Sequence, residues 1–266
     1  MTEANGSGAP RLLFLHDADV LPGPLGSLRE LAAEFDVEVP RHPGFGTDMD
    51  AAAADWDCVA DLAQHYLHRL ERDEGDAAGP LHLAGAGFGG WIALEMAVRR
   101  QRRFASLILV SPYGVKLFGR TEREFADILL LDPAEVVELG WADPAACHGL
   151  RMPGFPAHQD DAQNERAFAD RAALARYAWK PFMHDPRLRR WLHILTIPTL
   201  VVAGGADRLV APAHSSALAD LIPGARYVEI PGAGHYPYLE TPDAFRRAVT
   251  SFISDISANR KIGARQ

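Results

Sequence analysis

One short segment has the spacing of a reactive turn but lacks the atom that would react. Residues 83–90 read Leu-Ala-Gly-Ala-Gly-Phe-Gly-Gly, so Gly85 and Gly89 match the glycines of Gly-x-Ser-x-Gly. In that motif a strand passes sharply into a helix, and the serine between the glycines is exposed as a nucleophile. Here the middle position is Gly87. An acyl-enzyme is not expected at this position, because no activated oxygen is present.

A carboxylate and a histidine follow later in the chain, in contexts suited to proton transfer. Asp207 follows an apolar run and a Gly-Gly turn, and His235 follows Gly-Ala-Gly. A carboxylate that accepts a hydrogen bond from an imidazole fixes its tautomer and stabilises its charged form. We therefore predict a hydrogen bond between His235 and Asp207, and His235 would then serve as a general base.

The three segments in this order resemble the α/β-hydrolase superfamily over residues 11–256. The family order is nucleophile, acid, histidine, and the segments at Gly87, Asp207 and His235 follow it. The resemblance implies an α/β fold, a catalytic triad that is incomplete at Gly87, and catalytic roles for Asp207 and His235. We also expect the Cα atom of Gly87 to lie near the His235 ring, beside a space that a side chain could fill.

Other residues complete the expected pocket, which the resemblance places around the elbow: His16, Asp17, Phe88 and Ser111. The backbone N–H of Phe88 would donate to an oxyanion. Family members often carry His-Gly where this chain has His16-Asp17, so Asp17 brings a carboxylate to the place where negative charge is normally stabilised. Asp17 alternatively caps the following turn, and Ser111 either faces the site or is a turn residue at a strand end.

The glycines of residues 85–90 also partly match Gly-x-Gly-x-x-Gly of nucleotide-binding loops. That fingerprint requires an acidic residue about 20 positions later, and residues 107–111 contain none. The elbow is therefore the favoured interpretation, and no cofactor is expected.

Bulk composition narrows the class of protein. The 266 residues are 48% hydrophobic and 23% charged, which suits one large globular domain. The net charge of −8 argues against nucleic acid or anionic membrane as partners. Cys58 and Cys147 suggest no disulfide framework, and no Cys/His spacing suggests a metal site. No leader and no run of about 20 apolar residues is evident, so a cytoplasmic location is expected; the oligomeric state is left open.

Strand and helix signals alternate along most of the chain, which predicts a doubly wound, mostly parallel sheet with helices on both faces. The expected strands are 11–16, 36–40, 81–85, 106–111, 198–204 and 225–230, and the expected helices are 24–34, 54–71, 89–102, 212–222 and 241–256.

Residues 112–196 depart from this alternation and resemble the helical cap that the family inserts into its core, here 1–111 and 197–266. Helix-like stretches are expected at Glu122–Leu131, Pro133–Leu139 and Asn164–Trp179, with a break at 153–156. The segment is rich in large apolar side chains, which either pack the cap on the core or line an apolar pocket. These are Trp141, Phe155, Phe168, Tyr177, Trp179, Phe182 and Met183.

Three functions remain open from the sequence. The first is an enzyme in which His235, paired with Asp207, performs chemistry other than ester hydrolysis and without an acyl-enzyme. Its substrate would be a small apolar organic molecule, and the resemblance to serine hydrolases suggests an ester or another carbonyl compound. The second is a non-catalytic ligand-binding or interaction protein that keeps the fold. The third is a serine hydrolase that was inactivated by substitution at residue 87, whether natural or engineered.

Overall fold

Six parallel strands form the centre of the fold in the order β2-β1-β3-β4-β5-β6. The computed structural model describes residues 9–18, 28–46, 55–74, 80–119, 121–147 and 161–263. The strands are β1 (Arg11–Leu15), β2 (Asp36–Glu38), β3 (Leu81–Ala86), β4 (Ser106–Val110), β5 (Thr199–Gly204) and β6 (Arg226–Ile230). The central strands are fully buried, as expected of a parallel sheet that is covered on both faces.

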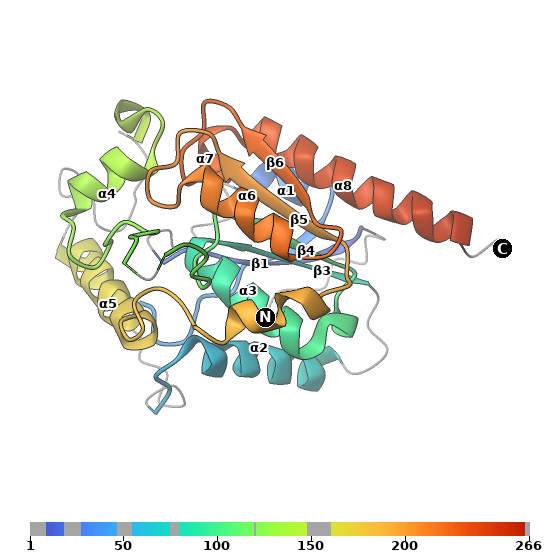
Figure 1. Ribbon diagram of the computed structural model, residues 1–266, viewed down its shortest axis with the longest axis horizontal. Helices are drawn as coiled ribbons and strands as arrows, with labels where there is room; N and C mark the ends of the chain where they lie inside the picture. Colours follow the sequence, from blue (N-terminus) through green and yellow to red (C-terminus); the bar gives the residue numbers. More distant parts are fainter. Residues whose placement is uncertain are drawn as a thin grey trace.

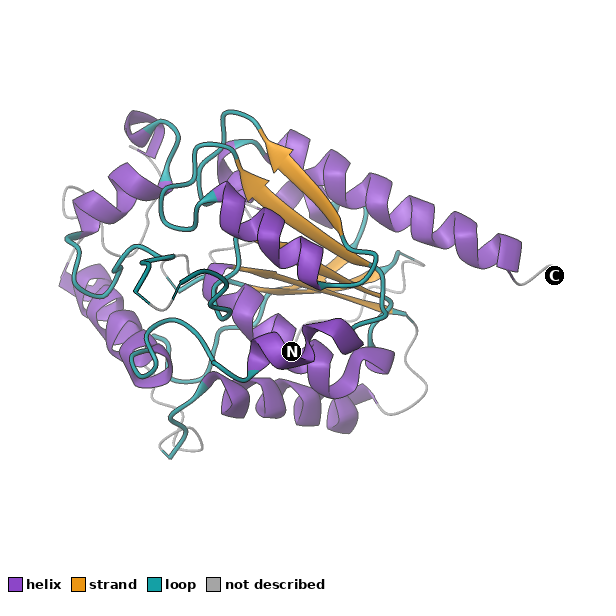
Figure 2. Ribbon diagram, viewed as in Figure 1, coloured by secondary structure: helices purple, strands orange, loops and turns teal. Residues whose placement is uncertain are grey.

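Helices cover both faces of this sheet (Figures 1 and 2). Alternate strand residues point to opposite faces. Leu13, Leu83 and Leu109 pack with α2 (Val59–Glu74), α3 (Gly87–Arg100) and α6 (Pro212–Leu221). On the other face, Leu12 and Phe14 pack with α1 (Arg29–Ala32) and α8 (Pro242–Gly263). The α/β-hydrolase fold predicted from the sequence is confirmed.

The direction of strand addition reverses between β1 and β3, and this reversal positions the candidate site. β1 pairs with β2 on one side and with β3 on the other. Ligands bind at such reversals, beyond the carboxyl ends of the strands. Leu15 of β1 is paired with Gly85 of β3. Asp17 and Gly87 each follow this pair by two residues, so the register brings them together.

Between β4 and β5 the chain forms α4 (Pro133–Gly140), η5 (Pro144–Cys147), α5 (Asp161–Ala178) and η7 (Leu188–Ile194). Figure 1 shows α4 and α5 beyond the carboxyl ends of the strands. The short helix α7 (Pro237–Glu240) precedes α8, and η4 (Gln101–Arg103) follows α3.

Several expected boundaries change. The expected helix at 122–131 is wrong, because tertiary partners take the polar groups of this segment. The Arg171 guanidinium donates to the carbonyls of Ile128 and Leu131, and Phe125 forms an isolated bridge with Val210. The expected break at 153–156, with Phe155, and the start of the expected helix at 24–34 lie outside the described residues.

Some of the large apolar residues of 112–196 are buried and others are exposed. Trp141, Tyr177 and Met183 are buried, whereas Phe168 is 78% exposed and Trp179 is 51% exposed. Phe182 is half-buried. Packing on the core therefore accounts for some of these residues and not for others.

The close approach of β1 and α3 requires a glycine at position 89. A Cβ atom at Gly89 would overlap the backbone carbonyls of Leu15 and His16, whereas one at Gly224 would have no heavy atom within 4 Å. We expect Gly89→Ala to lower the free energy of unfolding by about 3 kcal/mol, and Gly224→Ala to cost only about 1 kcal/mol for its left-handed backbone. Urea unfolding measures both. Equal costs would contradict this packing.

Candidate active site

Gly87 lies at the sharp turn where β3 passes into α3, as the elbow motif predicts. Its φ angle is +48°, a left-handed conformation that glycine adopts without steric cost. Its carbonyl accepts a hydrogen bond from the N–H of Tyr113, N···O 3.1 Å. The backbone of the elbow is thus present without a side chain.

The carboxylate of Asp17 occupies the space in front of this turn. Its Oδ1 accepts hydrogen bonds from the N–H groups of Phe88, at 2.8 Å, and Ala18, at 2.7 Å. Its Oδ2 lies 3.0 Å from Nε2 of His235. Two convergent N–H groups beside an elbow are the geometry of an oxyanion hole, and here a side chain of the protein itself fills it. The bond to Ala18 also gives Asp17 the turn-capping contact that was the alternative expectation.

The expected space beside Gly87, which a side chain could fill, is absent, and that prediction is wrong. A Cβ atom built on Gly87 would overlap Cγ and both carboxylate oxygens of Asp17. Asp17 and a side chain at position 87 therefore exclude each other in this arrangement. The two departures from the family pattern have a single steric explanation.

The expected hydrogen bond between His235 and Asp207 is present, with Nδ1 and Oδ2 2.8 Å apart. The other oxygen of Asp207 accepts from the N–H groups of Leu209 and Val210, each at 2.9 Å. These bonds fix the carboxylate, which in turn orients the imidazole. His235 is consequently held between two carboxylates, with each ring nitrogen facing one of them.

This placement controls the protonation of His235. Burial alone would lower its pKa, but the charge of Asp207 and the hydrogen bonds to Asp17 and Asp207 outweigh burial and raise the pKa to about 10. The ring is therefore an imidazolium at neutral pH, and both N–H groups donate. In this state His235 is an acid; it accepts a proton only once the Asp17 charge is removed or displaced.

His16 supports Asp17 through its backbone. The His16 ring stacks on His42 with centroids 3.9 Å apart, and its Nδ1–H donates to the Asp17 carbonyl at 2.7 Å. Nε2 of His42 donates to the His16 carbonyl at 2.9 Å, and its Nδ1 accepts from the Tyr66 hydroxyl at 2.8 Å. Burial lowers the pKa of His16 to about 4 and that of His42 well below its usual value, so both rings are neutral.

Sequence reasoning missed His42 and Tyr66. His42 follows β2 and Tyr66 lies on α2, and neither stands in a motif. Only the strand order, which places the end of β2 beside that of β1, would have pointed to His42.

Ser111 ends β4 with a φ angle of 42°. Its N–H donates to the Val202 carbonyl at 2.9 Å, and its buried hydroxyl has no hydrogen-bond partner in the described part of the chain. No bond joins it to Asp17 or His235. Ser111 is thus a strand-end residue next to the elbow, and no described base accepts a hydrogen bond from its hydroxyl.

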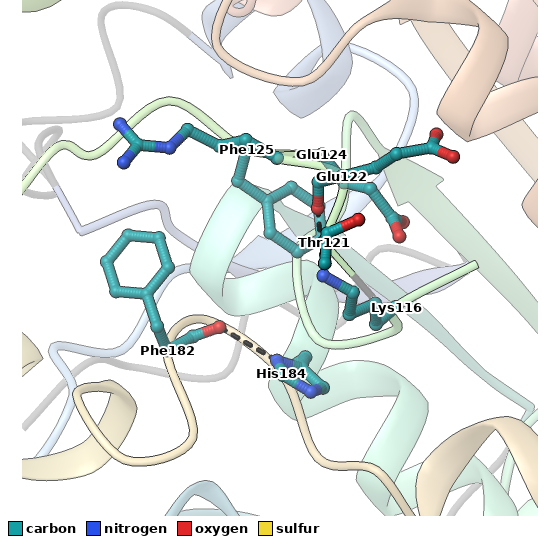
Figure 3. Close-up of a pocket in the computed structure, with 8 residues that line it drawn as sticks. Lys116, Thr121, Glu122, Glu124, Phe125, Phe182 and His184 are labelled. Atoms are coloured by element: carbon teal, nitrogen blue, oxygen red, sulfur yellow. Dashed lines mark hydrogen bonds between the residues drawn. The ribbon is translucent and has the colours of Figure 1, made fainter. Parts of the chain in front are cut away.

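Two aromatic rings connect His235 to a surface pocket. The Tyr113 ring lies 5.5 Å from the His235 ring, and Phe125 lies 5.3 Å from Tyr113, between ring centroids. Phe125 also lines a pocket of about 260 Å³ together with Lys116, Phe182 and His184. In Figure 3 these side chains come from two facing segments of the chain between β4 and β5. Sequence reasoning missed both Tyr113 and Phe125.

Among the residues that the structure describes, one group of potential metal ligands lies close together, and it does not include the residues of this site. Within the described ranges, the carboxylates and thiol that lie within 4.8 Å of one another are those of Asp57, Cys58 and Asp61, at the start of α2. None of the described helices is long and apolar enough to cross a bilayer.

Comparison with known proteins agrees with this architecture. A sequence model of the alpha/beta hydrolase family matches residues 4–248. The chain is 31% identical over 246 residues to the polyketide synthase ThaQ of Burkholderia thailandensis, a match that covers 85% of this chain but only 11% of the synthase. It is 28% identical over 246 residues to a 2-hydroxymuconate semialdehyde hydrolase of a Pseudomonas species, covering 86% of this chain and 80% of that one. A bacterial membrane phospholipase A has a similar fold, with a TM-score of 0.73, 21% identity, and 95% and 81% of the two chains covered.

The charge state of His235 can be read directly. At about pH 8, where an ordinary histidine is neutral, both ring nitrogens of His235 should carry protons, because its pKa is about 10. Nitrogen NMR of the histidine rings measures this, and His16, with its lowered pKa, serves as the neutral reference in the same spectrum. A neutral His235 at this pH would contradict the paired-carboxylate geometry.

The exclusion between residues 17 and 87 predicts strong energetic coupling. Gly87→Ala should destabilise the protein more when Asp17 is present than in an Asp17→Ala background, because the overlap is then gone. We expect an interaction energy of about 2 kcal/mol in this double-mutant cycle, measured by urea unfolding. Additive effects would mean that Asp17 moves aside at little cost.

Proposed function

The chain belongs to the alpha/beta hydrolase family, and from that premise we propose that it hydrolyses small organic molecules with the Asp17 carboxylate in place of the missing elbow hydroxyl. The observation that carries the proposal is the placement of its two oxygens. Oδ1 accepts from two N–H groups, and Oδ2 stands between the elbow and Nε2 of His235. Carboxylates are established covalent nucleophiles in enzymes.

A carboxylate at this position favours attack on saturated carbon. Attack on an ester carbonyl would give an intermediate that reverts, because a carboxylate leaves more readily than an alkoxide. A substrate carbonyl would also need the oxyanion hole, which Oδ1 occupies. Attack on a strained sp³ carbon instead gives a stable alkyl ester. We therefore favour an epoxide over the ester or other carbonyl compound suggested by the family resemblance.

The first step uses the proton that His235 holds. Oδ2 of Asp17 forms a bond to one ring carbon of the epoxide, and the bond from that carbon to the ring oxygen breaks. The ring oxygen takes the proton from Nε2 of His235. Asp17 becomes a neutral ester, so His235 loses one of the two carboxylate charges that raise its pKa and is left as a neutral base.

The second step uses the oxyanion hole. Neutral His235 accepts a proton from water, and the hydroxide adds to Cγ of Asp17. Negative charge builds on Oδ1, which already accepts hydrogen bonds from Phe88 and Ala18. Collapse expels the product alkoxide, which takes the proton from His235. The Asp17 carboxyl group then returns its proton to His235, so the sum is epoxide plus water to diol.

Other parts of the proposal rest on the surroundings of the site and on the expectations from the sequence. Residues 112–196 act as a cap over a small apolar organic substrate, and Tyr113 and Phe125 line the approach to His235. No cofactor takes part, and the enzyme is cytoplasmic. The mutual exclusion of Asp17 and a side chain at position 87 supports a site organised around glycine, rather than a serine hydrolase inactivated at one position.

One observation favours the second candidate, a non-catalytic binding protein. Asp17, Asp207 and His235 are all between 1% and 3% exposed, and a protein carboxylate already satisfies the oxyanion hole. A site closed in this way would keep the fold and a ligand pocket without reacting.

Isotope transfer tests the nucleophile. With styrene oxide in ¹⁸O-labelled water, we expect label to enter the Asp17 carboxylate, because water attacks Cγ. Mass spectrometry of the peptide that contains Asp17 detects it. Asp17→Asn should abolish diol formation and labelling, whereas the matched change Asp132→Asn, at the N-cap of α4, should leave both intact.

The possible outcomes separate the candidates. Diol without label in Asp17 would mean that His235 activates water directly and that Asp17 is not the nucleophile. No turnover and no label, with apolar ligands raising the melting temperature, would favour the binding protein. Burst kinetics with p-nitrophenyl esters would show that acyl transfer occurs and overturn the proposal.

A further inference from the structure

A cluster of arginines, none of them among the site residues described above, lies on two segments that pack together. Seven arginines are involved: Arg99, Arg100, Arg102, Arg103, Arg187, Arg189 and Arg190. They lie at the end of α3, on η4, and on or beside η7. The Gln101 side chain joins the segments, since it donates to the Ile194 carbonyl at 2.9 Å and accepts from the Thr196 N–H at 2.7 Å. The last turns of α3 contact η7, and the segment that contains η7 follows the yellow α5 along the chain in Figure 1. We call these seven residues the arginine cluster.

The arginine cluster borders an apolar hollow with an exposed tryptophan. The hollow has a volume of about 620 Å³. Its lining includes Trp191 with the apolar Val98, Leu188 and Ile194, and two ion pairs, Arg99 with Glu95 and Arg187 with Asp185. Trp191 is 53% exposed. Exposed tryptophan and arginine around a hollow are the residue types that dominate binding energy at protein interfaces.

Part of the cluster's charge is not compensated by any residue that the structure describes. Arg99, Arg100 and Arg187 pair with Glu95, Glu71 and Asp185. Arg102 and Arg190 are exposed and form no ion pair with any residue that the structure describes. A concentration of positive charge on a chain of net charge −8 is a local attraction for an acidic group.

We propose that the arginine cluster and its hollow dock an acidic segment of a partner protein, which inserts an apolar side chain beside Trp191. Arg102 and Arg190 are exposed on the two segments that bear the hollow, each one residue from a side chain that contacts or forms its lining. Their charges provide complementarity to an acidic segment and speed encounter. The apolar side chains in the hollow would bury an apolar side chain of the partner, which a purely electrostatic contact would not do. A nucleic acid fits less well. Its long row of phosphates would extend beyond the arginine cluster and meet the rest of this protein, whose net charge is negative.

A synthetic peptide of glutamates and leucines, labelled with fluorescein, tests this docking by fluorescence anisotropy. We expect binding that weakens with added salt and that quenches tryptophan emission in a Trp191-dependent manner. Arg102→Glu with Arg190→Glu should weaken binding at least about tenfold. Arg123→Glu with Arg247→Glu, which reverses two exposed arginines elsewhere, should leave it unchanged, and circular dichroism checks the folding of each variant.

Defined results would overturn the proposal. Absence of peptide binding at low salt would exclude the docking surface, and equal loss in both double variants would reduce it to non-specific charge attraction. Tighter binding of a single-stranded DNA oligonucleotide or of a phosphatidylglycerol vesicle, lost in the Arg102/Arg190 variant, would assign the surface to a polyanion or a membrane instead. Activity on styrene oxide is not part of this test, so its outcome is independent of the proposed reaction.

Discussion

The buried carboxylate of Asp17 is the constraint on which the site depends. A charge that is 1% exposed is tolerated only when it is paired and hydrogen-bonded. Phe88 and Ala18 supply two N–H donors to one oxygen, and His235 supplies a cation to the other. Each requirement fixes a neighbour: His235 must be protonated, the elbow must present its N–H, and position 87 must have no side chain.

The fold meets these requirements through strand register and through neutral histidines. Because Leu15 is paired with Gly85, β1 and β3 end at the same level. Asp17 and Gly87, each two residues further along, therefore lie next to each other. His16 and His42 then hold the backbone at Asp17 by a stacked pair of rings that burial keeps uncharged. Two neutral histidines beside one charged histidine in a small volume show how strongly local partners, more than residue type, decide protonation.

The sequence predicted the architecture because its signals are local. Each of these signals can be recognised in the chain without knowing which segments meet. They are the apolar runs of strand length, the glycine spacing around residue 87 and the order of Asp207 and His235. The position of the Asp17 carboxylate is not local, because it depends on the register between two strands and on donors from a third segment. Residues 122–131 also depend on distant contacts. Their sequence pattern predicts a helix, but carbonyls of this segment accept hydrogen bonds from Arg171 on α5. Composition and periodicity do not predict such contacts, because they join segments that are distant in the sequence.

The steric exclusion between Asp17 and position 87 also has a meaning for descent within the family. A lineage cannot gain the aspartate while it keeps a serine at the elbow, nor regain the serine while it keeps the aspartate, without passing through a crowded intermediate. The overlap thus excludes one of the possible combinations, an aspartate at position 17 with a side chain at position 87, and the two positions are constrained together. Relatives of this chain are best sorted by the pair of residues rather than by the elbow alone, since a glycine at the elbow beside a small residue on the first loop would mark a vacant site of another kind.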